Sequence, residues 1–279
     1  MDSVTIPARS WLFVPGNRQD RFVKAATSGA DRVILDLEDA VAPDAKEEAR
    51  HRLVGVMIPA NIPVYMRVNA VGTPWFEGDV AVAARLAIAG ILLPKAESAD
   101  HVARVRAKLP ATQRIVPIIE TALGAWNVLE VARASRVERL VFGALDFQLD
   151  TGMHDEGDTL ATVRSQIAIA SRIAGIGAPI DAVSLSFDDE AVMTAEAARS
   201  RRFGFGGKLC IHPKQIPIAN NAFRPSIADV EWAHGLLAEL AGRPGDAVFS
   251  FRGSLVDRPV IERAKRIKAQ AEAPGSGLA

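Results

Sequence analysis

Short runs of apolar residues, rich in β-branched side chains, alternate along the chain with longer segments that have the period of an amphipathic helix. The runs are apolar throughout instead of alternating with polar residues, which is typical of parallel strands covered on both faces. Eight such runs are present: Ser10–Val14, Arg32–Leu37, Val64–Val68, Gly90–Leu93, Ile115–Ile119, Leu140–Gly143, Ile180–Leu185 and Lys208–Ile211. The pattern therefore predicts eight parallel strands joined by helices.

The segments between the runs carry residues that begin helices. Asn17 is a candidate N-cap after the first run, Asp44 after the second and Ser98 after the fourth. Further helices are expected over Phe76–Ala89, Ala122–Ala134, Thr159–Ala174 and Asp188–Arg201. Strict alternation of strands with helices predicts an α/β protein, a (β/α)8 TIM barrel. An open doubly wound sheet is the alternative, and it is disfavoured because the chain has no glycine-rich nucleotide fingerprint.

Two more helical segments, Ile227–Ala241 and Arg258–Ala271, follow the eighth run and exceed what a barrel needs. Chains of this length are commonly a single domain when they form β/α barrels. We therefore expect one domain over residues 1–279, with a C-terminal helical extension from about residue 222 and a disordered tail over 274–279.

The composition narrows the class of protein. Hydrophobic residues make up 49% of the chain and charged residues 24%, as in ordinary soluble globular proteins. The formal net charge of zero argues against nucleic acid or a membrane surface as a partner. No apolar run has membrane-spanning length and the first residues lack signal-peptide features, so a cytoplasmic protein is expected. Cys210 is the single cysteine, which excludes an intramolecular disulfide, and its apolar run predicts an inert, buried thiol.

Polar residues follow almost every run where its strand would end, which in a β/α barrel is where the active site forms. Glu120 and Asp146 follow the fifth and sixth runs, so they would face the same opening from neighbouring strands. Two carboxylates without His or Cys nearby suit a hard cation with oxygen ligands, such as Mg²⁺. The alternative is that they cap helices or pair with Arg67 and Lys95.

Arg67 lies at the end of the third run, where its guanidinium could bind a carboxylate or an oxyanion through its fork. It could also form a structural ion pair with Glu38 or Asp39, and both roles can hold together. His212, at the end of the eighth run, is either a proton carrier or a hydrogen-bonded wall residue.

Several common catalytic motifs are absent. Residues 204–208 are glycine-rich, but they lead into a strand and no Ser or Thr follows Lys208, so they do not form a phosphate-binding P-loop. The chain contains neither G-x-S-x-G nor H-E-x-x-H. Serine hydrolases with a nucleophile elbow and zincin metalloproteases are therefore excluded.

An ordered set of motifs, RSWLFVPGN, DLEDAV, MRVNA, LLPKAE, IIET, FGALDF, GKLCIHPKQ and FSFRGSLVD, resembles the citrate lyase β-subunit-like branch of the HpcH/HpaI aldolase family. The resemblance runs from about Arg9 to about Arg263. It implies a (β/α)8 barrel that binds Mg²⁺ and cleaves or forms citryl-, citramalyl- or malyl-CoA-type thioesters. It also implies that Glu120 and Asp146 are the metal ligands, that Arg67 binds the substrate carboxylate, and that Glu38 and Asp39 lie beside that site.

The function expected from this resemblance is a magnesium-dependent carbon–carbon lyase that splits a hydroxyacyl-CoA into acetyl-CoA and an oxo acid. Arg21 and Lys24, after the first run, are the candidates for binding the CoA phosphates, although they could equally be a solvated helix face. A class II aldolase that releases pyruvate from a free hydroxy-oxo acid is one alternative. A carrier-dependent subunit of a citrate lyase-like assembly is another.

Asp257 is the candidate donor of the final proton. In relatives the corresponding acid reaches the active site of a neighbouring subunit, typically in a trimer, so the resemblance implies a homo-oligomer with a shared site. The plain alternative is that Asp257 caps the last helix, because it lies just before Pro259 and an expected helical segment.

Overall fold

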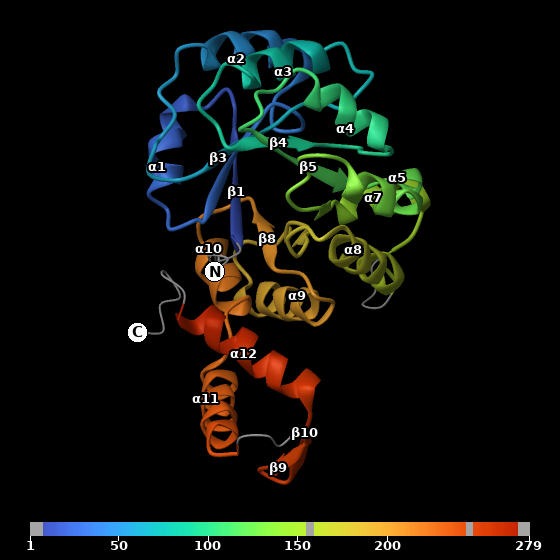
Figure 1. The fold of residues 1–279 in the computed structure, drawn as a ribbon. Helices are drawn as coiled ribbons and strands as arrows, with labels where there is room; N and C mark the ends of the chain where they lie inside the picture. The colour runs from blue at the N-terminus through green and yellow to red at the C-terminus, as the bar shows by residue number, and fades with distance from the viewer. Residues whose placement is uncertain (1–7, 155–158, 244–247, 273–279) are drawn as a thin grey trace. The chain divides into compact units, whose positions relative to one another are not determined.

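A computed structural model of the chain describes residues 8–154, 159–243 and 248–272 (Figure 1). The chain divides into two compact units, one formed by Pro7–Phe223 and the other containing Arg224–Ala279. The division falls where the C-terminal extension was expected, and the grouping of both units into one domain stays a prediction. The expected disordered tail lies outside the described residues.

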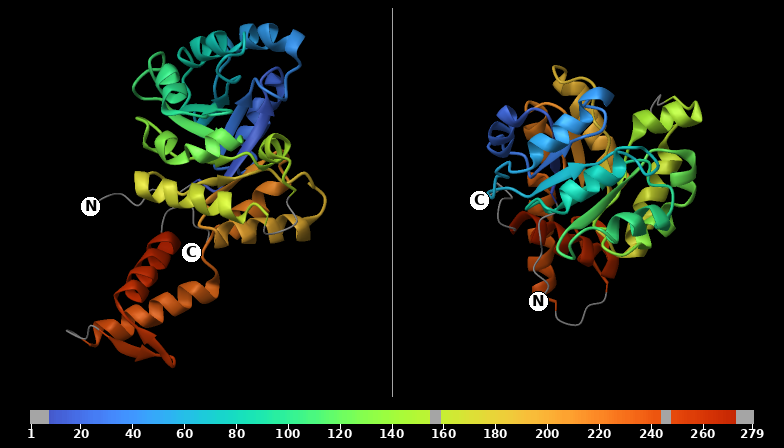
Figure 2. Two further views of the ribbon diagram at one scale, coloured as in Figure 1. Left: turned by 90° about the vertical axis from the view of Figure 1, so that its right-hand side faces the viewer. Right: turned by 90° about the horizontal axis from the view of Figure 1, so that it is seen from above.

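The first unit is a closed barrel of eight parallel strands in sequential order, which confirms the predicted (β/α)8 fold. Each expected apolar run overlaps one strand. The strands are β1 Ser10–Pro15, β2 Arg32–Asp36, β3 Val64–Arg67, β4 Gly90–Leu93, β5 Arg114–Ile119, β6 Val141–Phe142, β7 Ile180–Asp181 and β8 Gly207–Cys210. The helices of this unit surround the strands (Figure 2).

Successive side chains of each strand point to opposite faces of the barrel wall. One set, which includes Trp11, Ile34 and Tyr65, forms a buried cluster inside the barrel. The other set packs in a larger cluster against the helices. Asp36 and Arg67 are two residues beyond Ile34 and Tyr65, so they share the inward register, and they are direct partners in the pairing of β2 with β3.

The helices of the first unit lie between consecutive strands, except for the last, which follows β8. They are α1 Phe22–Ala26, α2 Lys46–Leu53, α3 Phe76–Ala83, α4 Ala99–Arg106, α5 Ala122–Trp126, α6 Val128–Arg133, α7 Ala144–Thr151, α8 Ala161–Ala174, α9 Glu190–Arg202 and α10 Gln215–Ala222. Ser98 caps α4 as predicted, since its side chain accepts the backbone N–H of His101. No helix in the described ranges of the chain is long and apolar enough to cross a membrane.

Several helix boundaries predicted from the sequence are wrong. Asn17 is not an N-cap, because a 3-10 turn, η1 Gln19–Arg21, comes first and α1 begins only at Phe22. Asp44 lies inside a second 3-10 turn, η2 Pro43–Ala45, which precedes α2. The helix expected over Phe76–Ala89 is shorter and ends at Ala83. The helix expected over Ala122–Ala134 is divided into α5 and α6. The prediction missed α7 and α10.

The second unit contains the two helices expected after the eighth strand, α11 Ile227–Ala241 and α12 Arg258–Glu272, with a hairpin between them, β9 Phe249–Phe251 and β10 Ser254–Val256. Its own apolar core consists of Ala233, Leu236, Phe249, Val256, Ala264 and Ile267. The hairpin was not predicted. Its turn places Arg252 and Gly253 at φ angles of 50° and 78°, the left-handed pair that a tight hairpin turn requires.

Candidate active site at the carboxyl ends of the strands

A cavity of about 380 Å³ opens at the carboxyl ends of the barrel strands, where β/α barrels place their active sites. The ionisable side chains that line it are Asp36, Asp39, Arg67, Glu120 and Asp146. Four of these five were predicted from the sequence as site residues. The fifth, Asp36, was not assigned a role because the sequence alone does not show which residues of the segment Asp36–Asp39 point into the barrel.

Arg67 binds three carboxylates of the loop that follows β2. Its Nε and Nη2 donate to the two oxygens of Asp36 over 2.7 and 2.6 Å. Its Nη1 lies 2.9 Å from Glu38 Oε2 and 3.0 Å from Asp39 Oδ2. Burial alone would lower the pKa of Arg67, but Asp36, Glu38 and Asp39 raise it overall. The structural ion pair considered for Arg67 is therefore present, and the bidentate partner is Asp36.

The contacts of Arg67 limit what it can offer to a ligand. A guanidinium has five N–H donors, one on Nε and two on each terminal nitrogen. The three acids take the Nε donor, both sides of Nη1 and one donor of Nη2. Among the described residues, the second N–H of Nη2 is left over. Arg67 can therefore donate to one oxygen of a substrate, but its fork is not open to a second carboxylate.

Glu120 follows β5 and is buried, with 3% of its surface exposed. Its Oε1 accepts the backbone N–H of Lys95 over 2.8 Å. Gly143 leaves room for the other oxygen, because a Cβ atom at that position would lie 2.4 Å from Oε2. Burial, together with the negative charges of Glu38 and Asp146, raises the pKa of Glu120 to about 8.

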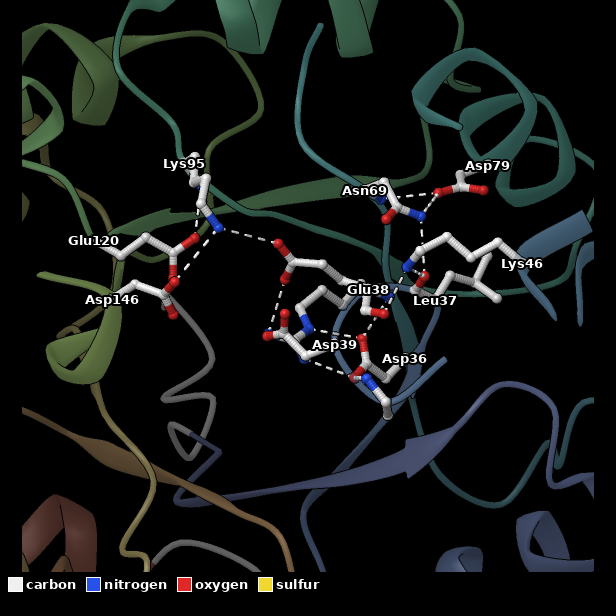
Figure 3. Close-up of polar contacts among 12 residues, drawn as sticks. Asp36, Leu37, Glu38, Asp39, Lys46, Asn69, Asp79, Lys95, Glu120 and Asp146 are labelled. Carbon is white, nitrogen blue, oxygen red and sulfur yellow. Dashed lines mark hydrogen bonds and ion pairs between the residues drawn. The ribbon is translucent and has the colours of Figure 1, made fainter. Parts of the chain in front are cut away.

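Lys95 connects the two halves of the site, as Figure 3 shows. Its Nζ lies 3.5 Å from Asp146 Oδ1 and 3.4 Å from Glu38 Oε1. Asp146 was expected at the end of the sixth strand, but β6 ends at Phe142 and Asp146 lies four residues later, in the first turn of α7. Burial and the negative charge of Asp39, against the pull of Arg67, raise the pKa of Glu38 to about 7.

A network of buried side chains holds the loop after β2 in place (Figure 3). Lys46 Nζ donates to the carbonyl oxygens of Leu37 and Glu38 over 2.8 and 2.7 Å. Asn69 Nδ2 also donates to Leu37 O, over 2.9 Å, and Asp79 accepts both N–H groups of Asn69. These contacts fix the backbone that carries Glu38, and the sequence analysis had not identified them.

The donor set at the cavity fits a hard divalent cation. Glu120 and Asp146 offer only oxygen atoms as ligands. The pKa of Glu120 is raised because its carboxyl group is buried, and a bound cation would stabilise the ionised form. No group of three or more His, Cys, Asp or Glu side chains that could hold a metal occurs within the described ranges. Two carboxylates leave coordination positions for water and substrate, which is how Mg²⁺ is usually bound.

Other predicted residues lie away from the cavity. Arg21 and Lys24 are exposed, on η1 and α1, and do not line it. His212 accepts the backbone N–H of Lys214 over 3.2 Å and stacks on Phe187, in the manner of the wall residue considered for it. Cys210 is buried, and burial raises the pKa of its thiol to about 12, in line with the inert role expected.

Asp257 belongs to the second unit, where its Oδ1 accepts the backbone N–H of Val260 over 3.2 Å at the start of α12. The capping role considered for it is therefore present. Its role as a proton donor to a neighbouring subunit stays a prediction.

The sequence matches the HpcH/HpaI aldolase/citrate lyase family over residues 9–213. It is 36% identical to the citrate lyase subunit beta-like protein of Deinococcus radiodurans, over 93% of this chain and 95% of that protein. It is also 36% identical to the (3S)-malyl-CoA thioesterase of Cereibacter sphaeroides, over 96% of this chain and 95% of that protein.

Among solved structures, the barrel resembles CitE from Mycobacterium tuberculosis in complex with magnesium, acetoacetate and coenzyme A. The TM-score is 0.84 and the sequence identity 35%, with 96% of this chain and 99% of that chain covered. Another structure of CitE, with magnesium and pyruvate, gives a TM-score of 0.74 at 32% identity, covering 94% of this chain and 98% of that one.

Proposed function

The chain belongs to the HpcH/HpaI aldolase/citrate lyase family, and from that premise we propose that it is a magnesium-dependent carbon–carbon lyase acting on a hydroxyacyl-CoA thioester. The products are acetyl-CoA and an oxo acid. The observation that carries the proposal is the pair Glu120 and Asp146 in a cavity that also presents Arg67. The magnesium and coenzyme A complex of the similar CitE supports the same assignment.

Glu120 and Asp146 would hold the metal ion. When bound, Mg²⁺ supplies Lewis-acid polarisation of the hydroxyl and carboxylate oxygens of the substrate. Lys95, within 3.5 Å of Asp146, reduces the repulsion between the carboxylates of the site. The glycine at position 143 keeps space beside Glu120 for a ligand, since any larger residue would contact that carboxylate.

Arg67 donates its remaining Nη2 hydrogen to the oxygen of the carbinol carbon, which becomes the keto oxygen of the oxo acid. The three acids bound to Arg67 orient the guanidinium, and the Arg67 side chain lines the cavity. During cleavage the hydroxyl gives its proton to a carboxylate that lines the cavity, and the electron pair of the O–H bond forms the C=O bond. The bond to the neighbouring methylene breaks, and that methylene becomes the enolate carbon of acetyl-CoA, which then takes up a proton.

Asp257 of a neighbouring subunit donates that proton, and Arg21 and Lys24 bind the CoA phosphates in this proposal. The first assignment comes from the family resemblance, and the second from the exposed positions of Arg21 and Lys24 in the segment that follows β1. A subunit-mixing assay tests the first. Asp257→Asn protein and Glu120→Gln protein, each inactive alone, should recover activity after verified subunit exchange, and no recovery would mean that the site is not shared in this way.

The deciding experiment is turnover of the purified protein alone with malyl-, citramalyl- and citryl-CoA. Acetyl-CoA and the oxo acid are quantified separately from free CoA, because one similar protein is named a thioesterase. Acetyl-CoA formation supports the lyase, whereas free CoA alone would indicate hydrolysis. Cleavage of free hydroxy-oxo acids only would indicate a class II aldolase, and turnover only with a carrier-bound acyl group would indicate a subunit of a larger assembly.

A further inference from the structure

The proposed function leaves open which oxo acid is released. We propose that the substrate acyl group carries a single carboxylate and a methyl-sized alkyl substituent on its carbinol carbon. The oxo acid is then a short 2-oxo acid with an alkyl group in place of a second carboxylate. This inference rests on the proposed function and assigns the substrate class from the lining of the cavity.

The cavity has two chemically different sides. Every ionisable side chain that lines it comes from the segments that follow or end β2, β3, β5 and β6. The side formed by β1, β7 and β8 presents only apolar side chains among the described lining residues: Phe13, Ala182, Val183, Leu185, Leu209 and Ile211. A substrate bound to Arg67 and to a metal ion held by Glu120 and Asp146 therefore has its remaining substituents next to apolar side chains.

The apolar side of the cavity has a buried inner part and an exposed outer part. Leu209 is 5% exposed and, with Ile118 at 2%, belongs to the cluster that fills the barrel. Leu185 and Ile211 are 65% and 43% exposed. The pantetheine arm of CoA must reach solvent, so it passes the exposed residues. The acyl group ends at the buried ones, and its substituent there is surrounded by Leu209, Ile118 and Val183.

Among the described residues, no cation lines this apolar side to pair with a second carboxylate. Arg67 and Lys95 are the cations beside the cavity, and both already face carboxylates of the protein. Five acids, Asp36, Glu38, Asp39, Glu120 and Asp146, contact these two residues, so carboxyl groups outnumber cations in the site before any substrate binds. Burying an unpaired carboxylate against apolar side chains is strongly unfavourable. A methyl group at the same place gains from burial.

The test compares kcat/KM for three thioesters that differ only in this substituent: malyl-CoA with hydrogen, citramalyl-CoA with methyl and citryl-CoA with carboxymethyl. One methyl-sized group in an apolar pocket is worth roughly 10–200-fold, so citramalyl-CoA should exceed malyl-CoA by about tenfold or more. Citryl-CoA should be the poorest. If citryl-CoA or malyl-CoA is cleaved best, the inference is wrong although the lyase assignment stands. If none is cleaved, the proposed function fails instead.

A matched pair of variants tests the wall directly. Val183→Lys places a cation on the partly buried apolar side, where a flexible Lys side chain can reach the cavity. It should raise the ratio of citryl-CoA to citramalyl-CoA turnover by at least about tenfold, because it supplies the missing partner. Val192→Lys makes the same change on α9, outside the cavity lining, and should leave the ratio unchanged. An equal change of this turnover ratio in both variants would overturn the inference, and so would an unchanged ratio in a folded Val183→Lys protein. If Val183→Lys does not fold, the comparison of the three thioesters with the unmodified protein decides the question.

Discussion

Two ion pairs of the barrel are built alike but face opposite sides of its wall. Asp36 pairs with Arg67 across β2 and β3, and Asp181 pairs with Lys208 across β7 and β8, each as direct register partners. The first pair has the inward register and lines the cavity. The second points outward, where Asp181 also lies 3.7 Å from Arg164 of α8 and accepts the hydroxyl of Ser200.

The two pairs differ in their balance of charge. Around Asp181, burial would raise the pKa of the carboxyl, but Lys208 and Arg164 lower it overall. Around the cavity, acids outnumber cations, and the pKa of Glu120 rises to about 8 through burial and its acidic neighbours. A buried ion pair therefore does not mark a functional site by itself. An excess of carboxylates beside a cavity is the feature that indicates one here.

The largest expected effect comes from the outward pair. Asp181→Asn removes the buried carboxylate that both Lys208 and Arg164 face, with Glu196 remaining beside Lys208, and should lower the free energy of unfolding by about 3 kcal/mol. Denaturant titration at neutral pH measures this loss. Asp146→Asn is the control on the cavity side, and its half-exposed carboxylate should cost far less. Similar losses in the two variants would contradict the comparison.

The next effect concerns the inward pair. Arg67→Lys keeps the positive charge but removes the planar fork that binds Asp36 and presents the last Nη2 donor. Turnover should fall by at least about tenfold, which corresponds to about 1.4 kcal/mol in the barrier. The melting temperature should change little, because the charge that balances the three acids remains. A large loss of stability with a proportionate loss of turnover would assign Arg67 a structural role only.

The eight strands could be predicted because their residues carry the signal locally. Runs such as Arg32–Leu37 are apolar and β-branched, and a barrel interior accepts little else. Helix starts were less predictable. Ser98 caps α4 as expected, but the chain after Asn17 takes a 3-10 turn first, which a capping residue does not reveal. The hairpin at Arg252 has no Asn-Gly or Asp-Gly turn signal and was missed.

The site residues that could be predicted are those whose place follows from their residue type and from their position at the end of a strand. Arg67 ends β3 and Glu120 follows β5, and both side chains line the cavity. Asp36 and the supporting network of Lys46, Asn69 and Asp79 were not found, because their roles depend on which backbone atoms approach one another after folding. The apolar side of the cavity likewise appears only when distant strands are brought together.

A smaller effect concerns pH. In the absence of metal the pKa of Glu120 is raised from 4.5 to about 8, so the stability that its protonated form contributes is complete below 4.5 and is lost as the pH rises through 8. Metal requires the ionised form. The affinity for Mg²⁺ should therefore increase between pH 6.5 and 8.5, by at most about tenfold per unit, with release of a proton on binding.

Calorimetry in two buffers of different ionisation enthalpy measures both the affinity and the proton release. Glu120→Gln is the control, because it removes the titrating carboxyl group, and it should remove most of the pH dependence of whatever affinity remains. A pH-independent affinity in the unmodified protein would contradict the raised pKa.

The central claim is that the excess of carboxylates at the cavity exists to hold Mg²⁺. Equilibrium Mg²⁺ binding at pH 8, measured without substrate on the unmodified protein and on the Asp146→Asn and Asp181→Asn variants, tests it most directly. The account predicts saturable binding at one site in the unmodified protein, loss of at least about tenfold in affinity for Asp146→Asn, and unchanged affinity in folded Asp181→Asn protein. Equal affinity in the unmodified protein and Asp146→Asn would contradict it.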